Sequence, residues 1–326
     1  MRVLVTGATG FIGLEVATQL AERGLRPRLM VRRASRAPLL HHLDAEVVHG
    51  DLASPATLRR AVAGCDAVIH LAGRAVFEPA HRLVDSFVHG TRHLAEAAAE
   101  EGVTRVVFAS SLLVHGDTRV PITPSTPAAP AVDYGQVKLL VEQGLSRFGA
   151  QRGMSVANLR LPHVYGATDQ LFGRVRTGTL VVPGRSTSPY GHLHVVDAAR
   201  ALIRAAEIGW VGAGALADRE SVGWSTFLGE IDDQLPGLRV VRAPAPLALM
   251  GTGVLSAATA WRSGPSLYTP DTVRSWNLSL PVDPDALWPE LGIEPLLPTY
   301  REGIAHTLDD RVAVRWRHPV ADHRAA

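Results

Sequence analysis

A tyrosine and a lysine stand four residues apart in a segment whose pattern predicts a helix over about 134–151. This spacing puts Tyr134 and Lys138 on one face of the helix. A phenol with its usual pKa near 10 exchanges protons poorly at neutral pH, but a neighbouring ammonium stabilises the phenolate and lowers that pKa. The two residues are therefore a candidate acid/base unit, with Tyr134 as the group that transfers the proton.

Lys138 also stands out in the composition. The chain has 33 basic residues, and Lys138 is the only lysine among them. Arginine presents a broad planar fork, whereas lysine places a compact ammonium. With five tyrosines in 326 residues, chance alone seldom puts the single lysine four positions after one of them.

Hydroxyl groups follow the apolar run that precedes this helix. Ser110 and Ser111 come directly after Val106-Val107-Phe108-Ala109, at the expected carboxyl edge of a sheet, where doubly wound folds bind ligands. A serine there can hydrogen-bond a substrate carbonyl beside Tyr134. A turn or a helix cap is the structural alternative for either serine.

A glycine-rich turn lies near the start of the chain, between an apolar run at 3–5 and a helical pattern at about 11–23. Glycines permit a tight turn and close approach of the backbone to a pyrophosphate, which then sits at the positive helix N-terminus. The Gly-x-x-Gly-x-x-Gly spacing is one residue longer than the usual fingerprint. The predicted cofactor-binding residues of this turn are Gly7, Thr9, Gly10, Phe11, Ile12 and Gly13.

The second apolar run ends at Val31-Arg32-Arg33. An acidic residue there favours NAD by accepting hydrogen bonds from the ribose, whereas an arginine pairs with a 2′-phosphate. Arg32, helped by Arg33 and Arg36, therefore predicts NADP (NADPH) over NAD. The alternative for Arg32 is a solvated basic turn.

The elements that must position these residues alternate along the first half. Runs that are apolar on consecutive positions suit strands buried on both faces, and helical patterns between them imply parallel strands. We predict an α/β protein with a Rossmann-type doubly wound parallel sheet. The expected strands are 3–5, 28–31, 46–48, 67–69, 105–108 and 156–159, and the expected helices are about 11–23, 56–63, 87–101 and 134–151.

The regular alternation of apolar runs and helical patterns changes after Gly166. We predict a dinucleotide-binding domain over 1–166, with 194–212 returning to it, and a smaller, partly interleaved α+β substrate-binding cap over 167–193 and 213–310. Residues 311–326 are basic and lack periodicity, which predicts a surface tail. The apolar stretch 247–261 is shorter than the roughly 20 residues that span a bilayer, so we expect a core or pocket-lining helix.

Composition narrows the classes of function. The 46% apolar and 20% charged residues fit a globular protein, and 33 basic against 31 acidic residues argue against a nucleic-acid partner. We also expect no membrane partner. The single cysteine, Cys65, cannot form an internal disulfide, and the first strand follows Met1 closely, so we expect a reducing cytoplasm.

Together these residues resemble the extended short-chain dehydrogenase/reductase family, with its NAD(P)-dependent epimerases and dehydratases and its 3-beta-hydroxysteroid dehydrogenase and dihydroflavonol reductase branch. The resemblance covers nearly the whole chain. Besides the glycine turn, the serine segment and Tyr134 with Lys138, the matching segments are Gly50-Asp51-Leu52, Ile69-His70-Leu71-Ala72-Gly73, Leu159 to Gly166, His194-Val195-Val196-Asp197 and Glu290-Leu291-Gly292.

The resemblance implies roles for particular residues. Ser111, four residues before His115, is the catalytic hydroxyl, and Lys138 holds the nicotinamide ribose as well as tuning Tyr134. It also implies a homodimer formed through the 87–101 and 134–151 helices. Asp51 and Leu52 border the adenine, Leu71, Ala72 and Gly73 line the cofactor channel, Pro162 and Val164 pass near the nicotinamide, and the substrate-pocket candidates are Leu113, His115, Arg185, Tyr190 and His192.

Three positions depart from the family pattern. Phe87 stands where an asparagine is frequent, which puts a supporting hydrogen bond in doubt, and His115 replaces a usual tyrosine. Leu112-Leu113 follow the serine where sugar-nucleotide dehydratases of this family tend to have an Asp-Glu pair. Elimination chemistry of that type is therefore not expected.

The leading prediction is an NADPH-dependent carbonyl reductase, or the reverse alcohol dehydrogenase, acting on a fairly apolar small molecule. One alternative is an NAD-dependent nucleotide-sugar epimerase, against which Arg32 argues. Another is a catalytically silent dinucleotide-binding sensor or scaffold, against which Tyr134 and Lys138 argue. The pairs His89/His93 and His192/His194 have metal-compatible spacing but no evident third ligand, so no metal is predicted.

Overall fold

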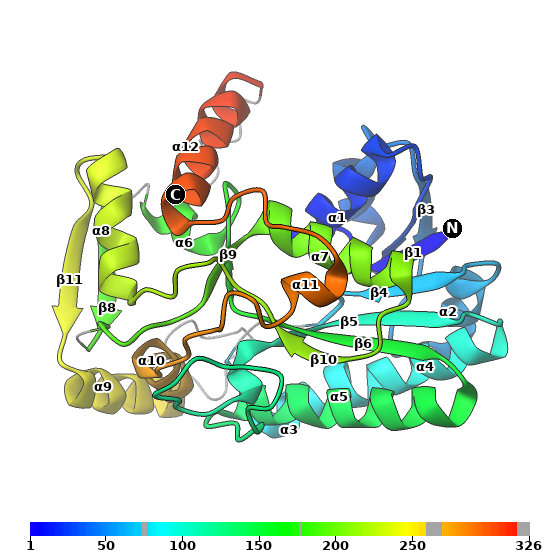
Figure 1. Cartoon of the computed structure of the whole chain (residues 1–326), viewed down its shortest axis with the longest axis horizontal. Helices are drawn as coiled ribbons and strands as arrows, with labels where there is room; N and C mark the ends of the chain where they lie inside the picture. Colours follow the sequence, from blue (N-terminus) through cyan, green and yellow to red (C-terminus); the bar gives the residue numbers. More distant parts are fainter. Residues whose placement is uncertain (74–76, 176–177, 185, 259–268, 318–326) are drawn as a thin grey trace.

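The computed structural model of the chain describes residues 1–73, 77–175, 178–184, 186–258 and 269–317 (Figure 1). A seven-stranded, all-parallel sheet forms its centre, in the order β10-β6-β5-β4-β1-β2-β3. The order of the strands reverses between β1 and β4, which creates the switch point where such sheets bind ligands. The strands are β1 (Val3–Thr6), β2 (Arg28–Val31), β3 (Glu46–His49), β4 (Ala67–His70), β5 (Arg105–Ser111), β6 (Ser155–Leu161) and β10 (Gly212–Ala215).

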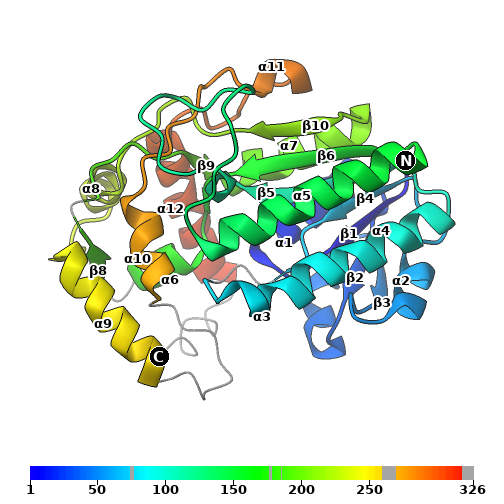
Figure 2. The same ribbon diagram turned by 90° about the horizontal axis from the view of Figure 1, so that it is seen from below.

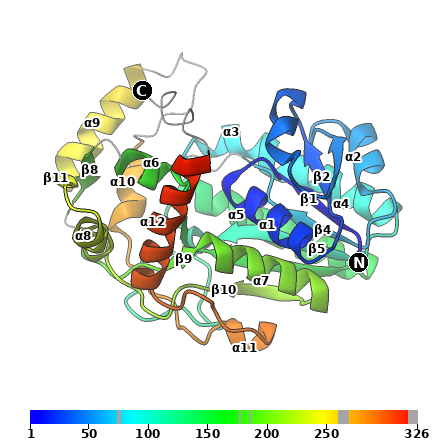
Figure 3. The same cartoon turned by 90° about the horizontal axis from the view of Figure 1, so that it is seen from above.

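Helices cover both faces of the sheet, and Figures 2 and 3 show one face each. On one face α1 (Phe11–Glu22) packs against α7 (Val195–Ile208). The other face carries α2 (Pro55–Val62), α4 (Gly90–Glu100) and α5 (Asp133–Arg152). Because both faces are covered, every residue of β1, β2 and β4 is buried, as their consecutive apolar positions predicted.

Shorter elements connect these layers. They are η1 (Ala34–Leu40), α3 (Ala80–Val84), the π-helical turn η2 (Asp85–His89) that continues into α4, the 3-10 turn η3 (Leu112–Val114) and α11 (Trp288–Leu291). Gly153 follows α5 and Gly209 follows α7, both with positive φ, the left-handed conformation that suits glycine at a helix end.

A smaller cap lies beyond the sheet, on the side of β8 and β11 in Figure 1. Its strands form two parallel pairs, and its helices surround an apolar core rich in aromatic side chains. The pairs are β7 (His163–Tyr165) with β9 (His192–His194) and β8 (Thr179–Pro183) with β11 (Arg239–Ala243). The helices are α6 (Gln170–Val175), α8 (Trp224–Gln234), α9 (Ala245–Ala258), α10 (Pro270–Asn277) and α12 (Tyr300–Arg317).

The predicted fold class is confirmed, and all six expected strands of the first half lie in the sheet. The chain enters and leaves the cap at other positions than predicted. The boundary at 212/213 cuts through β10, which pairs with β6 at the edge of the sheet. Trp288 and Leu291 of α11 return to the core beneath α7, although they lie within the predicted cap. Helix α12 continues to Arg317, so residues 311–317 of the predicted tail are helical, and the remainder of that tail, 318–326, lies outside the described residues.

The expectation of a core or pocket-lining helix at 247–261 is also wrong for one face of α9. Leu247, Met250 and Val254 are 63%, 68% and 71% exposed. They recur at i, i+3 and i+7, so one side of α9 presents an apolar stripe to solvent. No described helix combines the length and apolar character required to cross a membrane.

Candidate active site

The glycine turn after β1 has a backbone that only glycine accommodates. Gly7 has φ +70°, and a Cβ there would lie 2.8 Å from the Ala72 nitrogen. A Cβ on Gly13 would lie 2.1 Å from the Gly7 carbonyl oxygen, so the first turn of α1 rests directly on the loop. Gly10 precedes α1 and carries no capping side chain, which leaves the first amides of the helix available to an anion.

A buried hydrogen-bond chain fastens the end of β4 to β1. The Thr6 hydroxyl accepts hydrogen bonds from the amides of Leu71 and Ala72, both at 3.2 Å. The Thr6 hydroxyl in turn donates a hydrogen bond to His70 Nδ1 at 2.7 Å, and His70 Nε2 donates one to the Thr91 hydroxyl at 2.9 Å. Burial, and next the charge of Lys138, lower the pKa of His70 to about 3, so this link is neutral. It holds the predicted cofactor-channel segment 71–73 beside the glycine turn.

The predicted adenine and phosphate ends of the site also have defined surroundings. The Asp51 carboxylate accepts a hydrogen bond from the Ala53 amide at 3.0 Å, and Leu52 packs where a Cβ on Gly90 would otherwise stand. Arg32, at the end of β2, is exposed. Among the described residues, no carboxylate forms an ion pair with its guanidinium. The neighbouring Arg33 and Arg36 are exposed as well.

The start of α5 is seated tightly against the end of β5. A Cβ on Gly135 would lie 2.0 Å from the Leu113 carbonyl oxygen, so only glycine allows this approach. The Asp133 carboxylate accepts a hydrogen bond from the Ala80 amide at 2.9 Å, and the Asp133 amide donates to Asp271 at 3.0 Å. These contacts set Tyr134 where α3, α5, η3 and α10 meet. The fold therefore brings Tyr134 beside the segment that follows Ser111.

Tyr134 and Lys138 share one face of α5, as predicted. The Lys138 ammonium lies 5.6 Å from the centre of the Tyr134 ring and donates a hydrogen bond to the Ala109 carbonyl at 2.7 Å. Lys138 is buried, and burial lowers its pKa to about 7, against the opposing effect of Glu142. Burial raises the pKa of Tyr134 above its ordinary value.

This result corrects the expectation that the ammonium lowers the pKa of the Tyr134 phenol. The loss of water around the phenol outweighs the neighbouring charge, because burial disfavours the phenolate. The phenol keeps its proton at neutral pH, which is the form that a general acid needs.

Ser111 ends β5 and caps η3. Its hydroxyl oxygen accepts a hydrogen bond from the Leu113 amide at 3.2 Å, which leaves the hydroxyl proton available to another acceptor. Ser110 is buried, and its hydroxyl has no hydrogen-bond partner among the described residues. The two serines therefore differ in local role, and Ser111 is the one at the carboxyl end of the strand.

The substrate-pocket candidates divide into two groups. Tyr190 and Leu113 are both buried in the cap core, and burial together with the nearby Tyr134 raises the pKa of Tyr190. His115 and His192 are completely buried, with both ring nitrogens engaged. Neither imidazole has a free nitrogen for a substrate. Arg185 lies outside the described residues.

The partners of these two histidines explain their burial. His115 Nδ1 donates to the Pro127 carbonyl at 3.0 Å and Nε2 accepts from Arg160 at 3.3 Å. His192 Nε2 donates to the Val222 carbonyl at 3.1 Å. Because that bond takes the only proton of a neutral ring, His192 Nδ1 must accept the 3.2 Å hydrogen bond from His163 Nδ1. Burial lowers the pKa of His115 and of His192, so both rings stay neutral.

Pro162 and Val164 flank His163 at the start of β7, and all three are partly exposed. A Cβ on Gly166 would meet the Phe11 ring at 3.1 Å, so this segment lies beside the glycine turn. The glycine turn and the predicted nicotinamide segment are thus neighbours in the fold.

Two side-chain contacts near the site were not predicted from the sequence. His163 Nε2 lies 3.6 Å from the Asp169 carboxylate. Arg160 and Glu142 form a buried ion pair at 2.8 Å. The two partners of each pair do not share a helix or strand, so local periodicity does not identify them.

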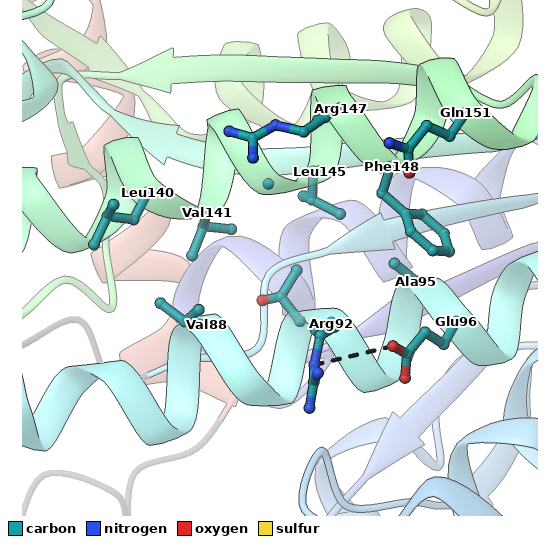
Figure 4. Close-up of a pocket in the computed structure, with 12 residues that line it drawn as sticks. Val88, Arg92, Ala95, Glu96, Leu140, Val141, Leu145, Arg147, Phe148 and Gln151 are labelled. Carbon is teal, nitrogen blue, oxygen red and sulfur yellow. Dashed lines mark ion pairs between the residues drawn. The ribbon is translucent and has the colours of Figure 1, made fainter.

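A cavity of about 270 Å³ lies away from this site, between α4 and α5 (Figure 4). Leu140, Leu145 and Phe148 of α5 face Val88 and Ala95 across it. Arg92 and Glu96 form an ion pair at 4.0 Å along the α4 side. The cavity is thus an apolar groove with a charged edge, formed by the two helices for which the sequence predicts a subunit contact.

Comparisons with known proteins agree with this geometry. A family model described as the NAD dependent epimerase/dehydratase family matches residues 3–212. The chain is 29% identical over 273 residues to a ceramide reductase of Caulobacter vibrioides, covering 82% of this chain and 81% of the relative. It is 31% identical to a 3-beta-hydroxysteroid dehydrogenase of Mycolicibacterium neoaurum over 53% of this chain and 50% of that protein. The solved structure of MoeE5 in complex with UDP-glucose and NAD superposes with a TM-score of 0.76 at 25% identity, covering 96% of this chain and 100% of that chain.

Proposed function

Because the chain belongs to the NAD-dependent epimerase/dehydratase family and is an oxidoreductase, we propose that it transfers a hydride between NADP(H) and a carbonyl or secondary alcohol. The observation that carries this proposal is the position of Tyr134. Its protonated phenol lies beside the buried Lys138 and next to the segment that follows Ser111. The substrate we propose is a fairly apolar small molecule.

The glycine turn fits a dinucleotide. Added side chains at Gly7 and Gly13 would collide with the backbone, and the space above α1 is left to main-chain amides, which suit a pyrophosphate. When bound, the cofactor supplies or accepts the hydride. Its remaining parts would be bordered by residues 71–73, Asp51, Leu52, Pro162 and Val164.

The side chains of this chain would manage the substrate oxygen and its proton. The Ser111 hydroxyl, with its proton free, hydrogen-bonds the substrate carbonyl oxygen. The Tyr134 phenol donates its proton to that oxygen as negative charge develops there in the reduction. Lys138 would hold the nicotinamide ribose, and its ammonium would make the face of α5 beside Tyr134 electropositive.

Arg32 supports NADP(H) as the preferred cofactor. Its guanidinium is exposed at the end of β2, near two further exposed arginines, and none of the described carboxylates forms an ion pair with it. A dianionic 2′-phosphate would supply the missing partner. An NAD ribose would leave this cluster unused.

Aromatic rings around Tyr134 favour an apolar substrate. Phe77 and Phe87 each lie 5.9 Å from the Tyr134 ring, and Trp224 lies 5.5 Å from Tyr190. These rings make the surroundings of Tyr134 apolar, and Phe87, Tyr190 and Trp224 are themselves buried. Relatives with related substrates include the ceramide reductase and the steroid dehydrogenase.

The second candidate is a nucleotide-sugar epimerase with retained NAD. It is favoured by a UDP-glucose 4-epimerase of Azospirillum brasilense that is 35% identical over about half of this chain and half of that enzyme. Incubation of the purified chain with NADPH and a panel of apolar ketones, and separately with UDP-glucose and UDP-galactose, distinguishes the two. We expect oxidation of NADPH with a ketone and no interconversion of the sugars. Epimerisation without added cofactor, or no oxidation of NADPH with any carbonyl tested, would contradict the proposal.

We also propose that the chain forms a homodimer through α4 and α5. The apolar groove between these helices and the 54% exposed Leu140 would pack against the same groove and leucine of a second copy across a twofold axis.

We propose the reducing cytoplasm as the location of the protein. The single cysteine of the chain, Cys65, is buried and unpaired, which is compatible with that location.

A further inference from the structure

Phe87 occupies an unusual turn next to the acid/base pair. It lies in the π-helical turn η2, a type of turn that is frequent at functional sites, and its side chain is only 2% exposed. A Cβ on Gly73 would lie 2.2 Å from the Phe87 ring, so the ring fills the space that the absence of a side chain at Gly73 provides. The position of Phe87 is therefore set by the end of β4 as well as by its own helix.

The Lys138 ammonium is surrounded by aromatic faces. Its nitrogen lies 4.5 Å from the centre of the Phe108 ring and 4.6 Å from that of Phe87, with the Tyr134 ring at 5.6 Å. It donates a hydrogen bond to the Ala109 carbonyl at 2.7 Å. A cation within about 6 Å of a ring centre is attracted by the π face, and most strongly where water is excluded.

The charged and titratable groups around Lys138 are few. Glu142 lies one turn along the same helix and favours the ammonium, but its carboxylate already binds Arg160. His70, on β4, stays neutral, and so does Tyr134 on α5. With one carboxylate shared and two neutral neighbours, the ring faces are a principal stabilising contact of the buried cation.

We propose that Phe87 is a positioning residue, whose ring holds the Lys138 ammonium against the Ala109 carbonyl. Of the two phenylalanines, Phe87 is the one that also touches Tyr134, at 5.9 Å and edge to face. It therefore links the two members of the acid/base pair. The inference rests on the proposed function only in assuming that Lys138 takes part in the reaction. The contact between the Phe87 ring and the Lys138 ammonium is present without cofactor or substrate.

The single lysine makes the test direct. Protein labelled with ¹³C at lysine Cε gives one lysine signal, and its pH titration reports the ionisation of Lys138 in the cofactor-free chain. Removing a π face destabilises the charged form, so we expect the midpoint of Phe87→Leu to fall by about one pH unit below that of the unmodified chain. Phe87→Tyr keeps a π face and should titrate like the unmodified chain.

Phe77→Leu is the matched control. Phe77 contacts the Tyr134 ring, but its ring is not among those over the ammonium, so its midpoint should stay unchanged. If Phe87→Leu does not fold, Phe87→Met removes the π face with a more adaptable side chain and is expected to lower the midpoint similarly. A folded Leu or Met variant that titrates like the unmodified chain would overturn the inference.

Kinetics separate this inference from the proposed function. With NADPH and an accepted ketone, the high-pH limb of kcat should move down in Phe87→Leu by the same amount as the NMR midpoint, while KM for the ketone changes little. A shifted midpoint in a chain without reductase activity would uphold the contact and refute the proposed function. An unshifted midpoint in an active reductase would uphold the proposed function and refute the role of Phe87.

Discussion

Replacement of the buried lysine by methionine should change how the stability of the protein depends on pH. In Lys138→Met a side chain of similar length but without charge occupies the site between α5 and β5. The pKa of Lys138 is about 7 in the folded chain and 10.5 in its ordinary state. Between these values the unfolded chain binds more protons than the folded chain, so the free energy of unfolding rises with pH.

The size of the effect follows from these two pKa values. Each unit of pKa difference corresponds to about 1.4 kcal/mol. Integration from pH 7 to pH 9 gives a rise of about 2 kcal/mol in the stability of the unmodified chain that the methionine variant lacks. The free energy of unfolding of the methionine variant therefore exceeds that of the unmodified chain most at and below pH 7, where the unmodified chain carries the buried charge. This advantage of the variant shrinks as the pH rises.

Urea denaturation of both proteins at pH 7, 8 and 9, without cofactor, measures this difference. All other titrating groups are shared, so they cancel in the comparison. Lys138→Arg is the control, because arginine does not titrate in this range and should follow the pH trend of the methionine variant while keeping a charge. A stability difference that stays constant from pH 7 to pH 9 would refute the reasoning, since the ammonium would then be as easily charged in the folded chain as in the unfolded one.

Four other changes have distinct expected outcomes. Arg32→Asp should weaken NADPH at least about tenfold and NADH much less, by fluorescence titration at one ionic strength, because only NADPH carries the 2′-phosphate; equal losses would contradict the assignment. Tyr134→Phe should reduce turnover by about 100-fold or more with NADPH affinity unchanged, since only the proton donor is removed; a rate near that of the unmodified chain would exclude this role. Gly135→Ala should lower the free energy of unfolding by roughly 1–3 kcal/mol in denaturant titration, because its Cβ would collide with the Leu113 carbonyl; unchanged stability would show that α5 shifts freely. Leu140→Arg should halve the mass seen by light scattering, and a monomeric mass of the unmodified chain would dismiss the dimer.

Local patterns in the sequence were sufficient to predict the sheet, the glycine turn after β1 and the shared helix face of Tyr134 and Lys138. Consecutive apolar runs can be satisfied only where both faces of a strand are covered, which specifies parallel strands between helices. Glycine at Gly7 and Gly13 is required by backbone geometry within the turn and its immediate contacts. Tyr134 and Lys138 share a face because helical periodicity alone puts them there.

The surroundings of the buried histidines depend on contacts between distant segments, which no local pattern encodes. His115 and His192 looked like pocket residues from their positions in the sequence. In the fold, their ring nitrogens are taken by groups from other segments, among them the Pro127 carbonyl and the Val222 carbonyl. Their distance along the chain from these partners is the reason that the sequence did not reveal them.

Burial was likewise decided by the tertiary structure alone. The burial that raises the pKa of Tyr134 and lowers that of Lys138 comes from the packing of several elements, whereas the sequence shows only the spacing of the two residues. The apolar pattern of α9 predicted burial, yet one face of this helix is exposed. Hydropathy records only the chemistry of a face, and the tertiary structure determines whether another element covers it.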